Sequence, residues 1–77
     1  MERVYKLRDG GTITATCAAD FVGQLHRGSK FDNQGSDQEY MYRFADRYHD
    51  MTGVAVRTDN AEHFLGDLIS SGYVSVD

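Results

Sequence analysis

The sequence contains no proline, no tryptophan and a single cysteine, Cys17. One thiol cannot form an intramolecular disulfide, so the fold must be stable without that cross-link. No run approaches the roughly 18 consecutive apolar residues that a membrane-spanning helix needs. The first eleven residues carry five charged side chains instead of an apolar secretion signal. We therefore expect a cytoplasmic protein with no membrane partner.

The length and composition predict a single α+β domain over residues 1–77. The chain is 40% apolar with a net charge of −4, which is typical of a folded domain with one thin core. The charge is uneven, because residues 1–30 carry five bases and three acids whereas residues 31–77 carry three bases and nine acids. Such a charge distribution orients a partner or a second copy, or simply provides solubility in an acidic protein.

One segment occurs twice. Thr16–Leu25 recurs 43 positions later as Asp59–Leu68, with Ala, Phe, Gly and Leu in the same places. Each copy follows a short run suited to a strand, Thr12–Ala15 and Val54–Arg57. We therefore predict two strand-then-helix units, related by duplication or by a shared helix pattern.

The strands are expected to form a small antiparallel sheet of three or four strands. A hairpin is predicted from 3–8 and 12–15, with Tyr5 and Leu7 on one side and glycines in the turn. Val54–Arg57 and Tyr73–Val76 complete the set. The order is β-β-α-α-β-α-β, with the helices mainly on one face of the sheet and the middle helix less firmly placed.

The helix limits follow from capping residues and glycines. We expect caps at Thr16, at Ser36 with Glu39 three residues later, and at Asp59 or Asn60. Gly28 should end the first helix in the left-handed conformation, and the others should end near 52–53 and 71–72. A loop is expected from Lys30 to Gly35. The predicted apolar faces are Ala18, Phe21, Val22 and Leu25; Tyr40, Met41, Phe44, Tyr48 and Met51; and Ala61, Phe64, Leu65, Leu68 and Ile69.

Two glycines occupy matching places inside the repeated helices. Gly23 and Gly66 each cost about 1 kcal/mol relative to alanine, and both lie nearly opposite the apolar stripe. Either the cost is tolerated, or another backbone passes close to these positions.

The middle helix carries polar residues and an aromatic ring away from its apolar face. Tyr42, Asp46 and His49 follow one another at helical spacing, with Arg43 and Arg47 beside them. Exposed tyrosine is typical of protein interfaces. We predict an interaction surface here with the two arginines at its rim.

Residues that suggest catalysis or metal binding do not form a recognisable set. His63 and Asp67 share a helix face, but a zinc site needs three or four ligands, so we interpret them as a solvated pair. Cys17 lies in a first helical turn, where a thiol can become reactive, but we interpret it as half-buried and structural. So short a chain is also expected to leave little room for a ligand pocket of several hundred Å³. We predict no catalytic residue, no cofactor and no metal.

These observations favour a non-enzymatic protein-interaction or regulatory module that binds another protein or itself, as a homo-dimer. A nucleic-acid regulator that uses Arg3, Lys6 and Arg8 around Tyr5 is the alternative, which the acidic composition disfavours. A small thiol or metal enzyme built on Cys17 or His63 is the third.

Overall fold

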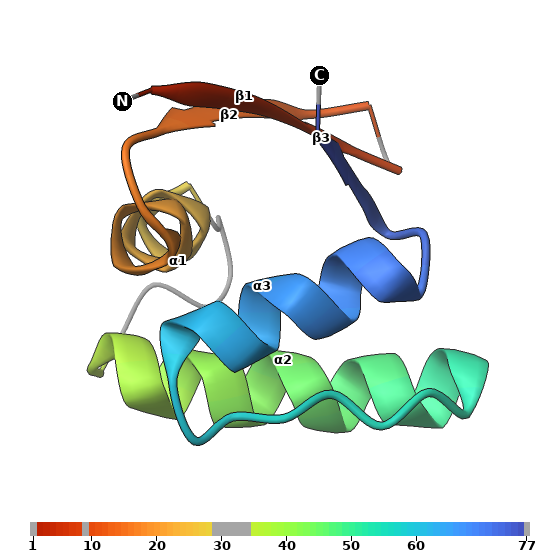
Figure 1. Ribbon diagram of the computed structural model, residues 1–77. Helices are drawn as coiled ribbons and strands as arrows, with labels where there is room; N and C mark the ends of the chain where they lie inside the picture. Colours follow the sequence, from red (N-terminus) through yellow and green to blue (C-terminus); the bar gives the residue numbers. More distant parts are fainter. Residues whose placement is uncertain (1, 9, 29–34, 77) are drawn as a thin grey trace.

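The computed structural model describes residues 2–8, 10–28 and 35–76. In chain order the elements are β1 Arg3–Leu7, β2 Thr12–Ala15, α1 Ala18–Arg27, α2 Asp37–Thr52, α3 Ala61–Ser70 and β3 Val74–Val76. The sheet forms one layer, with α1 and α3 beneath it and α2 farthest away (Figure 1). The predicted α+β class, with helices on one face of a small sheet, is confirmed. The expected loop at 30–35 lies outside the described residues apart from Gly35.

The sheet is antiparallel throughout, with the order β2-β1-β3. Tyr5 lies between Ile13 of β2 and Val76 of β3. The alternation of the strand turns Tyr5 and Leu7 toward the helices and leaves Val4 and Lys6 on the other face, as predicted. Gly10, with φ of +101°, supplies the positive φ in the hairpin turn.

The strand predicted at Val54–Arg57 is absent from the sheet. This segment runs alongside α2 on its way to α3 (Figure 1). Val54 and Val56 pack against the core, and the Arg57 amide donates to Asp67 Oδ2 at 2.8 Å instead of to a neighbouring strand. An alternating apolar pattern suits any extended segment with one covered side, so the pattern did not distinguish this one from a strand.

The capping residue predicted from the sequence is confirmed at α2 and is wrong at α1. Ser36 and Glu39 form the predicted reciprocal capping pair, and α2 ends at Gly53 with φ of +77°. At α1 the capping residue is Cys17 and not Thr16, because Cys17 Sγ accepts from the Asp20 amide. Gly28 ends α1 as expected but with φ of −80°, so the predicted left-handed conformation is wrong. Asn60 caps α3, one of the two predicted residues.

The core lies between the sheet and the three helices. Phe21, Phe64 and Leu68 are fully buried at its centre, and Tyr5 and Val74 close it from the sheet. Two residues of the predicted apolar faces lie outside it. Met51, in the last turn of α2, is 76% exposed, and Ile69, in the last turn of α3, is 37% exposed.

Candidate functional site

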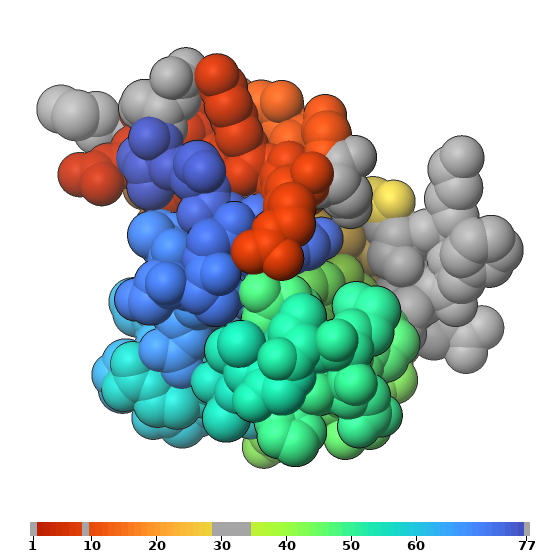
Figure 2. All heavy atoms as spheres, turned by 90° about the vertical axis from the view of Figure 1, so that its right-hand side faces the viewer, coloured from red at the N-terminus to blue at the C-terminus, as the bar shows by residue number. Residues whose placement is uncertain are grey.

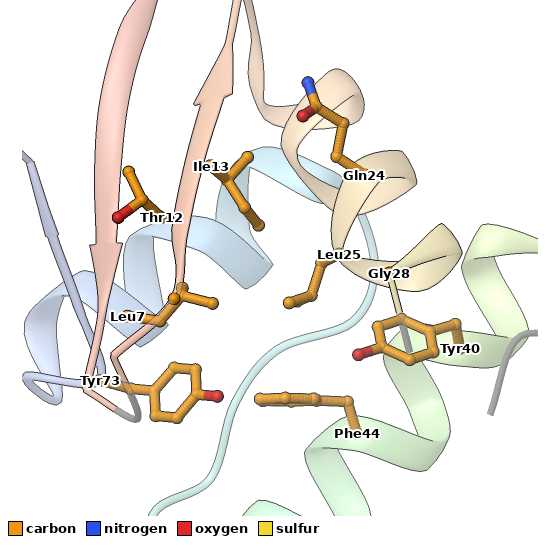
Figure 3. A pocket seen from close by; sticks show the side chains of 10 residues that line it. Leu7, Thr12, Ile13, Gln24, Leu25, Gly28, Tyr40, Phe44 and Tyr73 are labelled. Carbon is orange, nitrogen blue, oxygen red and sulfur yellow. The ribbon is translucent and has the colours of Figure 1, made fainter. Parts of the chain in front are cut away.

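An open hollow of about 470 Å³ lies between the β1–β2 hairpin, α1 and α2. We call it the large hollow. Figure 3 shows leucine and isoleucine side chains from the hairpin and α1 on one side, facing aromatic rings on the other. Its lining residues among those described are Leu7, Gly11, Thr12, Ile13, Gln24, Leu25, Gly28, Tyr40, Phe44 and Tyr73. This volume is in the range of ligand pockets, although the hollow is open at the surface and is not a deep cavity in the interior.

The leucine and isoleucine side chains of the large hollow are only half-buried. Leu7, Ile13 and Leu25 pack against the core on one side and line the hollow on the other. When a bound group covers apolar area of this kind, the complex is stabilised by about 25 cal/mol for each Å² removed from water. The hollow is therefore suited to an apolar group.

The aromatic wall of the large hollow is built around Phe44. Its ring centroid lies 5.5 Å from that of Tyr73, 5.6 Å from that of Phe64 and 6.1 Å from that of Tyr40. Two of these contacts are edge-to-face, an arrangement that aromatic pairs prefer. Because each ring is held by others, the wall is positioned before anything binds.

A second space of about 70 Å³ lies on the far side of the same wall. We call it the small hollow. It shares Phe44 and Tyr73 with the large hollow and adds Arg47, Tyr48 and Met51. Met51, which the sequence placed in the core, is therefore an exposed apolar side chain at the edge of a concave surface.

The predicted interaction surface on α2 divides into two parts. Tyr42, Asp46 and His49 are exposed, with Tyr42 56% exposed, and the helical period places them opposite the aromatic wall. Arg43 and Arg47 lie on the flank between the two faces, and Arg47 lines the small hollow. The arginines thus border the concave side of the protein, whereas the other three residues face away from it.

No described backbone passes close to either repeated glycine. A Cβ at Gly66 would meet no atom within 4 Å, and one at Gly23 would meet the Arg27 side chain at 3.0 Å and Asp37 Oδ2 at 3.6 Å. Within the described chain, side chains rather than a backbone cover Gly23, and Gly66 lies open. The close approach proposed from the sequence would have to come from a partner.

His63 and Asp67 do not pair with each other as expected. His63 Nδ1 lies 2.9 Å from Asp59 Oδ2, and Asp67 accepts from the Arg57 guanidinium at 2.9 and 3.0 Å. The Arg57 side chain, followed by its backbone amide, lowers the pKa of Asp67 to about 2. Among the described residues no three histidine, cysteine or carboxylate side chains cluster as metal ligands.

His26 is a buried polar residue that the sequence did not single out. It is 5% exposed, its ring stacks on Tyr40 at 4.8 Å, and its Nδ1 lies 2.9 Å from Asp37 Oδ1. It therefore joins α1 to α2 next to the large hollow. Its position four residues after Val22, on the apolar stripe of α1, is the signal that could have revealed it.

The residues on which the thiol-enzyme and nucleic-acid hypotheses depend are less favourably placed for those roles. Cys17 is exposed and caps a helix, so the half-buried position predicted for it is wrong. Tyr5, the aromatic residue expected to stack on nucleotide bases between Arg3 and Lys6, is 6% exposed and faces the core. Arg8 donates to the Ser71 carbonyl at 3.2 Å.

No family model, curated protein or solved structure matches this chain. None of the described helices is both long and apolar enough to cross a membrane.

Proposed function

We propose that this chain is a non-enzymatic binding module that holds an apolar group of another protein in the large hollow. The observation that carries the proposal is the hollow itself, about 470 Å³ in volume and lined by half-buried leucine and isoleucine side chains and by the aromatic wall. The bound group would cover apolar area that now faces water, and that burial drives association.

The surroundings of the hollow favour a protein partner. Protein interfaces combine an apolar centre with a polar rim, and arginine and aromatic residues are enriched in them. Here the aromatic wall forms the centre, and Arg47 lines the small hollow on its other side, with Arg43 one turn earlier on the same flank of α2. Tyr42, Asp46 and His49 on the outer face of α2 then provide either a separate contact or ordinary solvation.

Side chains that often serve in acid–base chemistry have structural contacts here. His26 contacts Asp37, His63 contacts Asp59, and Asp67 contacts Arg57. None of these six residues is among the described residues that line the large hollow. This arrangement supports a binding role for the hollow over a catalytic one.

A peptide selection with paired variants tests the proposal. Peptides that bind the immobilised protein are selected from a random display library, and their affinities are measured by titration. We expect the selected peptides to share an aromatic or large aliphatic residue. Ile13→Phe should fill part of the hollow and weaken their binding about tenfold or more, because a bound side chain would meet the new ring.

Thr14→Phe is the matched control. Thr14 is the next residue of β2, but its exposed side chain lies on the opposite face of the sheet. This variant should bind the selected peptides as the unmodified protein does. The proposal is wrong if no common apolar residue emerges, or if Ile13→Phe binds as tightly as Thr14→Phe.

A further inference from the structure

The small hollow is bordered by positive charge, although the chain as a whole has a net charge of −4. The exposed Arg47 lines it beside Phe44 and Met51. Asp46 and Asp50, the nearest acids in the sequence of α2, lie farther round the helix from Phe44 than Arg47 does, because each residue turns the helix by about 100°. Arg47 therefore brings its charge to the small hollow, whereas the two acids point away from the aromatic wall.

A second arginine reaches the same place from the end of β1. Arg8 Nη2 donates to the Ser71 carbonyl at 3.2 Å, and the Ser71 hydroxyl bonds the Tyr48 hydroxyl at 3.0 Å. Because Tyr48 lines the small hollow, these bonds hold the Arg8 guanidinium near its edge. Figure 2 looks onto this side, where the end of α2, in green, lies beside the turn before β3, in blue, with the end of β1, in orange-red, above them.

The apolar part of the small hollow favours a small group. Its volume is about 70 Å³, against about 470 Å³ for the large hollow. The Met51 side chain at its edge is 76% exposed, so a bound aliphatic group would remove apolar area from water. Methionine is flexible and adapts its shape to an apolar neighbour. A small aliphatic side chain with a negative charge beside it therefore matches both the shape and the charge of this site.

The two hollows follow one another along α2. Tyr40 borders the large hollow, Phe44 borders both, and Met51 borders the small one. At 1.5 Å per residue, the middle of 40–44 and the middle of 44–51 lie roughly 8 Å apart along the helix. An extended chain covers that distance in two to three residues, at about 3.3 Å for each. One short segment of a partner can therefore reach both hollows.

We propose that the small hollow binds an acidic side chain of the partner protein together with a small aliphatic side chain next to it. The carboxylate contacts Arg47 and Arg8, because guanidinium groups bind carboxylates through paired N–H donors. The aliphatic side chain packs against Tyr48 and Met51. The position of this pair, two to three residues from the group in the large hollow, rests on the proposed function. Binding of the pair itself can be measured without the large hollow.

A nuclear magnetic resonance titration with two short peptides tests the small hollow alone. The probes are the dipeptide acetyl-Asp-Val amide and its neutral counterpart, acetyl-Asn-Val amide. At low salt the acidic probe should shift the Met51 methyl signal with a dissociation constant of about 1–10 mM, and the neutral probe should bind about threefold or more weakly. The methyl signal of Met41, which is 4% exposed, is the internal reference.

Variants of the two arginines identify what holds the carboxylate. Arg47→Gln and Arg8→Gln should each raise the dissociation constant of the acidic probe about threefold. Arg3→Gln is the matched control, since it removes the same charge from an exposed side chain at the opposite end of β1. It should bind the probe as the unmodified protein does.

The outcomes separate this proposal from the proposed function. If the acidic probe shifts Met51 and Arg47→Gln weakens it, the small hollow binds the pair even where Ile13→Phe shows no effect on the selected peptides. An acidic probe that leaves Met51 unshifted up to about 10 mM overturns the proposal, and so does equal binding of the two probes or equal affinity of Arg47→Gln and Arg3→Gln. A Met51 signal that moves with protein concentration alone also overturns it, because a second copy would then occupy the hollow.

Discussion

At the scale of single residues, the first turn of α1 has an uncommon capping group. Cys17 Sγ accepts from the Asp20 amide at 3.5 Å, and the Asp20 carboxylate accepts in return from the Thr16 amide. Sulfur is a weak acceptor, and serine is among the preferred residues at this position. The cap therefore uses a weaker acceptor atom, and Asp20 bonds the amide of the residue before the cap instead of that of Cys17 itself.

This cap leads to a prediction about stability. Cys17→Ser should raise the free energy of unfolding, and Cys17→Ala should lower it, with a span of about 1 kcal/mol between the two variants. The reason is that a hydroxyl oxygen satisfies the Asp20 amide better than a thiol does, and a methyl group not at all. Urea denaturation followed by circular dichroism measures both.

Ser36→Ala at the cap of α2 is the reference for this series, with an expected loss of about 1 kcal/mol. If the serine and alanine variants at position 17 are equally stable, residue 17 does not cap α1.

At the scale of elements, the repeated helices differ in what surrounds their glycines. Gly66→Ala should stabilise the protein by about 1 kcal/mol, because alanine favours the helix and a Cβ would meet no atom within 4 Å. Gly23→Ala should stabilise it less, because the Arg27 guanidinium lies 3.0 Å from the new atom and must move. Thermal unfolding at low protein concentration measures both.

The two glycine variants also test whether the backbone of a partner approaches these helices. A destabilised Gly66→Ala variant would mean that another backbone approaches α3 at this position. Repeating the measurement at high concentration shows whether a second copy provides that backbone, since only then would the stabilisation decrease as two copies associate.

The helices were readable from the sequence because their signals are local. Ser36 and Glu39 are three residues apart, Asn60 bonds the amide of His63, and Gly53 directly follows the last turn of α2. Cys17 was missed as a cap because Thr16 beside it is the commoner capping residue. Val54–Arg57 was assigned wrongly because an alternating pattern shows that a segment has one covered side and not what covers it.

At the scale of the whole molecule, several carboxylates have a lowered pKa in the folded state. Hydrogen bonds from the Thr16 and Ser36 amides are the main cause for Asp20 and Glu39, and His63 is the main cause for Asp59. The Arg57 side chain and amide lower the pKa of Asp67 to about 2. Each contribution is fully present above the unfolded pKa of about 4 and is lost as pH falls through the folded pKa.

We therefore expect the free energy of unfolding to fall as pH decreases from about 4 to about 2. Asp67→Asn should make this decrease shallower and cost about 1 kcal/mol at neutral pH, since Arg57 is 60% exposed and water screens the pair. Urea denaturation at a series of pH values gives the slope. Asp50→Asn on the exposed side of α2 should leave it unchanged, and an equally steep decrease in Asp67→Asn would contradict the assignment.

The sequence by itself determined the α+β class, the hairpin, the three helices and most of the core, because caps, turns and apolar periods act over a few neighbouring residues. Only the tertiary structure decided which extended segments pair into the sheet, that Gln24 of α1 bonds the Thr14 carbonyl of β2, and that His26 lies buried against Tyr40. The large hollow belongs to this second group, since its walls come from four separate elements and the turn before β3. Such features depend on how distant segments pack together, and no local spacing in the chain records that packing.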